Sequence, residues 1–283
     1  MGAPAAPAAA PTVTCTAITK EFAARRGPVQ ALDGTELTLQ PGTVTALVGP
    51  SGCGKSTLLR IIAGLETATS GSVSIDGDAP ARLRKRGEIS VAFQDASLLP
   101  WRSVRSNIAL ALKLARRPAD PDHVHELIRL VGLDGFEHAK PAQLSGGMRQ
   151  RAAIARCLVT SPRLLLLDEP FGAVDELTRR RLNLELPPTW QHLGTTTLLV
   201  THSIPEAVLL ADEVVVMTAR PGTIAASVPV AIDRPRRAHH LHTPVFHALV
   251  DRVGDLLGVD SDAPTPDVTV PIEPSTLEPQ SSS

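Results

Sequence analysis

A glycine-rich loop between an apolar run and a helical pattern has the composition of a phosphate-binding loop. Its glycines allow backbone N–H groups to turn toward phosphate oxygens, and the helix that follows adds the positive end of its dipole. Lys55 can reach the β and γ phosphates, and the Ser56 hydroxyl can bind Mg²⁺. We therefore expect a nucleotide site in this loop. Its residues are Gly49, Pro50, Ser51, Gly52, Cys53, Gly54, Lys55, Ser56 and Thr57.

Two adjacent acids follow a second apolar run, the four leucines 164–167. Asp168 would lie at the carboxyl end of a buried strand, where open α/β sheets bind their ligands, and could hold Mg²⁺. The side chain of Glu169 points elsewhere along the pleat, where it can polarise a water for in-line attack on a γ phosphate. Together with the glycine-rich loop, the two acids predict a site for nucleotide hydrolysis.

The elements that must position these residues alternate between short apolar runs and helical patterns. Several of the runs are apolar throughout, as strands covered on both faces are, which predicts an α/β fold with a largely parallel sheet. From Ser103 to about Thr160 the pattern changes to helix after helix, which we interpret as a helical insertion. The predicted strands are 13–18, 43–48, 72–75, 89–93, 163–167, 196–200 and 213–217.

Composition excludes several classes of protein. The 28 Lys and Arg residues and the 29 Asp and Glu residues give a net charge of -1, so no overall field attracts nucleic acid or an anionic membrane. The apolar runs are far shorter than the roughly 18 to 20 residues that cross a bilayer. The first 15 residues contain no basic side chain, so we expect no signal peptide. The three cysteines suggest free thiols in a reducing cytoplasm.

The segment 144–151, Leu-Ser-Gly-Gly-Met-Arg-Gln-Arg, resembles the signature of the ATP-binding cassette family. The other motifs of that family follow the same order in this chain. Gln94 resembles the glutamine of the Q-loop, Asp175 the aspartate of the D-loop and His202 the switch histidine. Phe22, 27 residues before Gly49, matches the aromatic residue that stacks on adenine.

This resemblance implies an ATPase with ATP and Mg²⁺ as its cofactors. The implied catalytic residues are Glu169, His202, Gln94 and Lys55, and the implied Mg²⁺ ligands are Ser56, Gln94 and Asp168. The family's cassettes pair head to tail, so that Ser145, Gly146, Gly147 and Asp175 would contact the nucleotide held by a second subunit. The implied fold is a P-loop NTPase core with a mostly parallel sheet, an N-terminal antiparallel β part and an inserted α-helical subdomain.

A single cassette without a membrane span resembles the detached ATPase subunit of a bacterial importer. Such a subunit forms a homodimer on two permease subunits, which receive solute from a solute-binding protein, and it lies in the cytoplasm on the inner face of the cell membrane. Residues 93–101 and 219–222 resemble the branch that imports nitrate, sulfonates and taurine. In this family the permease contacts the residues just after Gln94, so Leu98 to Trp101 are candidates for that contact, with a buried turn as the alternative.

The composition also predicts domain boundaries. We expect disordered segments at 1–12 and 261–283, which are rich in Pro with Ala or Ser, a cassette domain over 13–237 with its helical subdomain at about 96–160, and a helical extension over 238–260. Three features depart from the branch. Pro187-Pro188 should break the helix after Asp175, and Ser203 and Pro205 put the support of His202 in doubt.

Other interpretations remain open at this point. A soluble cassette ATPase that acts on nucleic acid or ribosomes is the main alternative, although the interval from Gln94 to Ser145 contains no heptad run. A phosphoryl-transferring kinase is disfavoured because it has no use for the signature segment. Asp175 could serve as the N-cap of a helix, and the histidines at 239, 240 and 242 lack partners at metal-binding spacing.

Overall fold

The computed structural model describes residues 9–24, 27–172, 174–185 and 194–258. Pro187, Pro188 and the segments 1–8 and 261–283 lie outside the described residues, so the expectations for them are not tested. The strands are β1 (Val13–Phe22), β2 (Val29–Leu39), β3 (Val44–Val48), β4 (Ser70–Ile75), β5 (Ile89–Ala92), β6 (Leu164–Asp168), β7 (Thr196–Val200), β8 (Glu213–Met217) and β9 (Ile224–Pro229).

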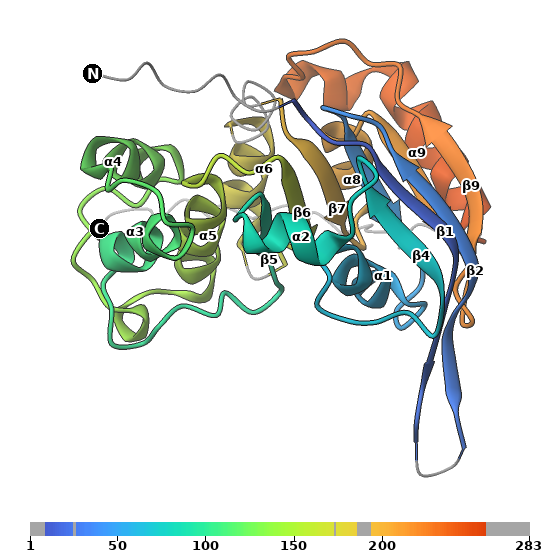
Figure 1. Cartoon of the computed structure of the whole chain (residues 1–283). Helices are drawn as coiled ribbons and strands as arrows, with labels where there is room; N and C mark the ends of the chain where they lie inside the picture. Colours follow the sequence, from blue (N-terminus) through green and yellow to red (C-terminus); the bar gives the residue numbers. More distant parts are fainter. Residues whose placement is uncertain (1–8, 25–26, 173, 186–193, 259–283) are drawn as a thin grey trace, which may run out of the picture.

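These strands form two sheets, and helices cover the larger of them (Figure 1). The first sheet is antiparallel, with the order β2-β1-β4. The second has the order β5-β6-β7-β3-β8-β9, in which every neighbouring pair is parallel except β8 and β9. The helices are α1 (Lys55–Ile62), α2 (Pro80–Lys85), α3 (Val104–Leu114), α4 (Pro121–Leu130), η1 (Pro141–Gln143), α5 (Gly146–Leu158), α6 (Glu176–Glu185), α8 (Ile204–Leu210), η2 (Ala238–His242) and α9 (Pro244–Leu256).

The predicted fold class is confirmed: a mostly parallel sheet, an antiparallel sheet near the N-terminus and a group of helices between β5 and β6. All seven predicted strands are present, but β2 and β9 were missed. In β2 the buried positions Thr35, Leu37 and Leu39 alternate with exposed ones, as in a half-buried strand, but Gly34 and the polar Thr35 obscure the pattern. In β9 only Val228 is buried, because this strand lies at the edge of the sheet.

The fully buried strands of the large sheet separate two hydrophobic clusters. In β3 the residues Val44, Ala46 and Val48 belong to one cluster, and Leu47 belongs to the other, as the alternation of side chains along a strand requires. The Leu47 cluster joins the sheet to α1 and to the antiparallel sheet. The Val44 cluster joins it to α3, α4, α5, α8 and α9. The expectation of strands covered on both faces therefore holds.

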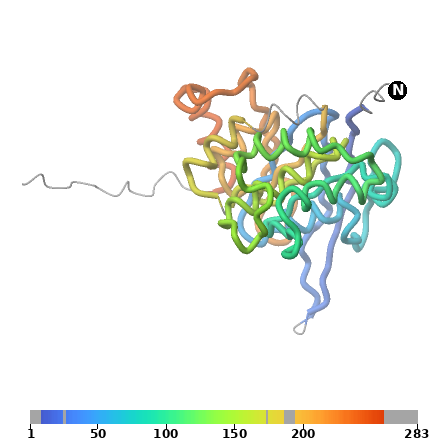
Figure 2. Tube along the Cα trace, turned by 90° about the vertical axis from the view of Figure 1, so that its left-hand side faces the viewer, coloured from blue at the N-terminus to red at the C-terminus, as the bar shows by residue number. Residues whose placement is uncertain are grey.

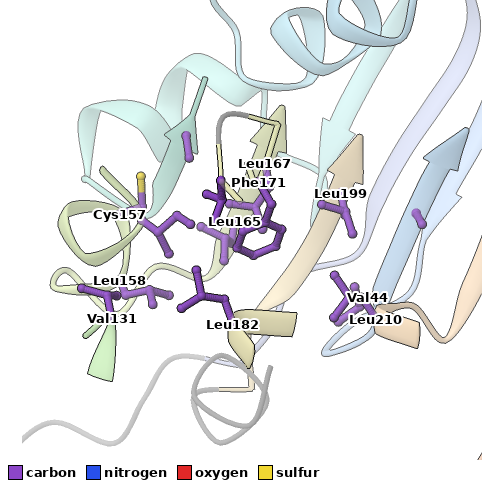
Figure 3. Close-up of a cluster of buried hydrophobic side chains, with 14 of the residues drawn as sticks. Val44, Val131, Cys157, Leu158, Leu165, Leu167, Phe171, Leu182, Leu199 and Leu210 are labelled. Carbon is purple, nitrogen blue, oxygen red and sulfur yellow. The ribbon is translucent and has the colours of Figure 1, made fainter. Parts of the chain in front are cut away.

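The helical subdomain shares the Val44 cluster with the sheet. Figure 3 shows Cys157 of α5 pointing toward Leu165 of β6, with the fully buried ring of Phe171 beside Leu165. Val131, at the end of α4, and Leu158 of α5 belong to the same cluster. Helix α3 begins at the N-cap Ser103 and α4 at the N-cap Asp120, with Pro121 at the first helical position. The subdomain is thus packed on the nucleotide-binding core through buried apolar side chains.

Both ends of the described chain are packed on the domain. Residues 9–12 were expected within a disordered segment, but Pro11 is buried and its carbonyl accepts a hydrogen bond from Thr196 Oγ1 at 2.6 Å. The Ala9 carbonyl accepts one from Arg163 Nε at 2.7 Å. At the other end, η2 and α9 lie in the predicted helical extension, and α9 packs on α8. The β1–β2 hairpin projects from the body of the molecule in both views (Figures 1 and 2).

Candidate nucleotide-binding site

The glycine-rich loop connects β3 to α1 and places the helix N-terminus at its end. Gly54 precedes α1 with a φ of +110°, and a Cβ atom there would lie 2.7 Å from Leu32 Cδ2 and 2.8 Å from the Ala31 carbonyl oxygen. Only glycine fits both this conformation and this space. The backbone N–H groups of the loop are therefore held at the start of a helix, as an anion site requires.

Lys55 spans the loop that precedes it. Its Nζ donates hydrogen bonds to the carbonyl oxygens of Gly49 at 2.7 Å and Pro50 at 3.0 Å, and its side chain is largely buried. The ammonium group is thus held directly beside the loop by weak, neutral acceptors. A phosphate oxygen would be a stronger, charged acceptor for the same group.

Ser56 and Asp168 form the second contact across the site. The Ser56 hydroxyl donates to Asp168 Oδ1 at 2.8 Å, which joins the first turn of α1 to the end of β6. Burial raises the pKa of the Asp168 carboxyl, and the Ser56 hydrogen bond partly offsets this. Two oxygen atoms at this distance are the kind of donors that Mg²⁺ accepts from a protein. The donor set therefore fits the predicted ion.

Gln94, Glu169 and His202 meet at the carboxyl edge of the parallel sheet. They follow or adjoin the ends of β5, β6 and β7. Glu169 Oε2 lies 3.3 Å from Gln94 Nε2 and 3.5 Å from His202 Nδ1. The Glu169 backbone has a φ of +48°, and its N–H donates to the Val200 carbonyl at 2.9 Å. Such a conformation is costly for a non-glycine residue and is typical of functional sites.

A cavity of about 320 Å³ joins these residues to the end of the antiparallel sheet. Phe22 lies in its wall and is 39% exposed, with Lys20 Nζ 4.8 Å from the centre of the ring. Gly49, Pro50 and Cys53 do not line the cavity, and Cys53 is buried. The lining residues are Phe22, Val29, Ala31, Ser51, Gly52, Gly54, Lys55, Ser56, Thr57, Glu169, His202 and Arg220.

Arg220 is a site residue that lies outside the predicted motifs of the nucleotide site. It follows β8 and lines the cavity together with Phe22 and Gly52. Its exposed guanidinium group can donate hydrogen bonds to a bound anion. One signal pointed to it, since Arg220 lies within the segment 219–222 that resembles the importer branch.

The signature segment does not contribute to this cavity. Ser145 is the N-cap of α5, and its Oγ accepts the Met148 N–H at 3.2 Å. Gly146 instead lines a separate cavity of about 280 Å³ together with Gln94. Asp175 caps α6 by accepting the Thr178 N–H at 3.0 Å. The predicted contacts of Ser145, Gly146, Gly147 and Asp175 with a nucleotide on another subunit remain predictions.

The loop 98–101 is held from beneath by one buried amide. Asn107 is fully buried on α3, its Oδ1 accepts the Leu99 N–H at 2.8 Å, and its Nδ2 donates to the Leu99 carbonyl at 3.2 Å and the Arg102 carbonyl at 3.1 Å. Leu98 packs against the core, whereas Trp101 is 68% exposed. The loop is therefore a rigid support that presents an aromatic side chain at the surface. This geometry excludes a turn that is buried throughout.

Ser203 and Pro205 are compatible with the structure around His202. Ser203 caps α8 by accepting the Glu206 N–H at 3.3 Å, and Pro205 lies in the first turn, where its missing N–H costs nothing. Thr201 Oγ1 accepts the Ser203 N–H at 3.1 Å and donates to Glu206 Oε2. These hydrogen bonds hold the loop on both sides of His202.

Comparisons with known proteins relate the chain to one family. A protein-family model described as ABC transporter matches residues 32–172. A nitrate import ATP-binding protein of Synechococcus elongatus is 45% identical over 223 residues, which cover 77% of this chain and 80% of the relative. An aliphatic sulfonates import ATP-binding protein of Bacillus subtilis is 45% identical over 242 residues, which cover 85% of this chain and 92% of the relative.

A solved structure has a similar fold and aligns with most of this chain. It is a dimeric ATP-binding cassette in a post-hydrolysis state, bound to ADP and phosphate. Its TM-score is 0.71 at 29% sequence identity, and the match covers 78% of this chain and all of the other. Among the described residues, the structure contains no helix of the length and hydrophobicity needed to cross a membrane.

Proposed function

The chain belongs to the ATP-binding cassette transporter family, and we propose that it powers the uptake of a small anion through a separate permease. It is an ATP-binding protein, and its activity is ATP hydrolysis. The observation that carries the proposal is the meeting of Gln94, Glu169 and His202 beside the glycine-rich loop, in a chain closely similar to nitrate and sulfonate import proteins.

In this proposal each group has its own role. Glu169 accepts a proton from the attacking water. Before ATP binds, Gln94 and His202 hold the Glu169 carboxylate in place. When ATP is bound, both side chains turn toward the γ phosphate. The Lys55 ammonium exchanges its loop carbonyls for phosphate oxygens. Phe22 and Arg220 border the entrance, where the base and ribose would lie.

Ser56, Asp168 and Gln94 are the residues that would hold Mg²⁺. The ion would supply positive charge to the β and γ phosphate oxygens. Burial raises the pKa of Asp168, which indicates that its carboxylate gains from a nearby cation.

We further propose that the working form is a head-to-tail homodimer on two permease subunits, supplied with solute by a solute-binding protein. The signature residues Ser145 to Gly147 open α5, so their N–H groups form a second anion site. That site does not line the cavity of its own chain, which favours contact with the nucleotide of a second subunit. Such a subunit would work in the cytoplasm, on the inner face of the membrane.

Nitrate, taurine or another small sulfonate is the proposed class of solute, because relatives named for nitrate and sulfonate import align over most of the chain. The names of these relatives describe import, so they give no support to the alternative of an ATPase acting on nucleic acid or ribosomes. Uptake of labelled nitrate, taurine and an alkanesulfonate by cells with and without this chain would test the proposal. Unchanged uptake of all three would contradict it.

Glu169→Gln tests the catalytic assignment directly. We expect hydrolysis to fall by roughly 10²- to 10⁴-fold, because the amide cannot accept the proton, while ATP still binds. Lys55→Ala should instead lose ATP affinity, since it removes the charge beside the loop. A Glu169→Gln protein that hydrolyses ATP at the wild-type rate would exclude Glu169 as the base.

A further inference from the structure

A cavity of about 620 Å³ lies between α3 and α4 in the helical subdomain and shares no lining residue with the nucleotide site. This volume lies in the usual range for small-molecule sites. The apolar lining residues are Ala109, Leu112, Ala119, Pro121 and Val124, and the charged ones are Arg105, Lys113, Arg116, Arg117 and Asp120. The surface that these walls present is mainly apolar. A ligand here would meet both apolar and positively charged groups.

The four cations of this lining form no ion pair with an acid of the subdomain. Across residues 96–160, all of which the structure describes, the single ion pair joins His123 to Glu126, and neither residue lines the cavity. The one acid in the lining is Asp120, which serves as the N-cap of α4 and accepts the His123 N–H at 2.9 Å. The cavity therefore has an excess of positive charge and can accept an anion.

Arg105 lies where the helix itself gives no reason for a cation. It is in the first turn of α3, directly after Val104 and the N-cap Ser103, and a positive charge there opposes the helix dipole. Its Nε atom is buried without a partner. In the described part of the chain its two terminal nitrogens are neither buried nor hydrogen-bonded, so they remain accessible to a ligand in the cavity.

Arg116 occupies a position that favours glycine. Its φ is +55°, its N–H donates to the Lys113 carbonyl at 3.1 Å, and the Arg117 N–H donates to the Leu112 carbonyl at 2.9 Å. These two bonds form the Schellman motif that ends α3, in which the left-handed residue is usually glycine. A cation near a helix C-terminus is favourable, but Lys113 and Arg117 already supply one without the left-handed backbone. The side chain of Arg116 therefore calls for an explanation outside the helix, and the cavity offers one.

We propose that this cavity binds a small amphiphilic anion, with a carboxylate or sulfonate headgroup on an alkyl chain. The guanidinium and ammonium groups of the lining receive the headgroup, and the apolar side chains of α3 and α4 cover the chain. The ligand is a free amphiphile, not a lipid within a bilayer, because the net charge of -1 gives the protein no overall attraction to an anionic membrane. The cavity is a second ligand site, separate from the one that holds ATP.

Calorimetry on the full chain without nucleotide tests the site, with monomeric 1-decanesulfonate as the probe. We expect saturable binding, and binding at least roughly tenfold weaker for decyltrimethylammonium, which reverses the charge, and for methanesulfonate, which lacks the chain. Equal affinity for the three compounds, or no binding of the probe up to about 1 mM, would overturn the proposal. Binding to phosphatidylglycerol vesicles without binding of the free probe would also overturn it. Because ATP is absent, the result does not depend on the proposed function.

Three variants locate the binding. Arg105→Gln combined with Arg116→Gly should weaken probe binding at least roughly tenfold, and the fold should persist because glycine suits a φ of +55°. Ala109→Trp should abolish binding by filling the cavity. Arg129→Gln, which removes an exposed cation of α4 outside the lining, should bind like the wild type. Wild-type affinity in either of the first two proteins, or an equal loss in Arg129→Gln, would show that the probe binds elsewhere and refute the site.

Discussion

Gly222 lies so close to the carbonyl oxygen of Cys53 that a Cβ atom on Gly222 would be 2.0 Å from it. The backbone of Gly222 is held in this position on both sides. Its N–H donates to the Ala31 carbonyl at 3.0 Å, and its carbonyl accepts the Asp33 N–H at 3.1 Å. The glycine-rich loop therefore rests on a second glycine, 168 positions after Gly54 in the chain.

Gly222→Ala should distort the glycine-rich loop. We expect weaker ATP binding and a free energy of unfolding lowered by about 1–3 kcal/mol, as for other overpacked sites. Gly254→Ala is the matched control, because a Cβ atom there meets nothing closer than 4.0 Å and alanine favours the α9 helix. Urea unfolding and titration with a fluorescent ATP analogue measure the two effects. Equal behaviour of the two variants would contradict the close packing of Gly222.

Phe22→Ala should weaken ATP binding by removing a stacking surface for the base. Loss of one base-to-aromatic contact corresponds to about 1–3 kcal/mol, or roughly a 5- to 150-fold rise in Kd. Phe136→Ala is the control, since Phe136 is similarly exposed at 42% but does not line the nucleotide cavity. Measuring the Kd for ATP in both variants tests whether Phe22 stacks on the base. An unchanged Kd in Phe22→Ala would assign adenine to another surface.

Trp101→Ser should weaken association with the permease while the ATPase rate of the isolated chain stays unchanged. The side chain is 68% exposed on a loop that Asn107 holds rigidly, so its loss removes apolar contact area without disturbing the fold. Leu114→Ser removes a comparably exposed apolar side chain, 75% exposed, from the end of α3. Co-purification with the permease compares the two. Normal complex formation by the Trp101 variant would exclude this loop as the main contact.

Glu206 should make the stability of the domain depend on pH. Burial raises the pKa of its carboxyl above the ordinary value of 4.5, so the folded state binds the proton more tightly than the unfolded state. The resulting stabilisation is complete below pH 4.5 and is lost as the pH rises through the folded-state pKa. Relative to Glu206→Gln, the wild-type free energy of unfolding should therefore fall with rising pH in urea titrations. A constant or rising difference would contradict the raised pKa.

The chemistry of the site could be predicted from sequence because its residues lie within short motifs that follow strands. Lys55, Ser56 and Asp168 required only the order strand, glycine-rich loop, helix and strand, since parallel strands bring their carboxyl ends to one edge. The same rule brings Gln94 and His202 to Glu169. The helical subdomain was likewise visible from its periodicity and from the N-cap at Asp120.

Other features depend on contacts between distant segments, which no local pattern encodes. Gly222 matters because the turn after β8 lies under the loop after β3, and Arg220 enters the cavity from that same turn. Residues 9–12 looked unstructured by composition, yet backbone carbonyls of this segment bond Arg163 and Thr196.

The Val44 cluster, which runs without a break from the helical subdomain into the sheet, has a consequence for how the domain unfolds. Val131 and Leu158 belong to the same cluster as Leu165 and Phe171 of the nucleotide-binding core. The helices therefore have no hydrophobic core of their own that would let them melt separately. Heating should give one cooperative transition, in which the helical subdomain and the sheet lose their structure together.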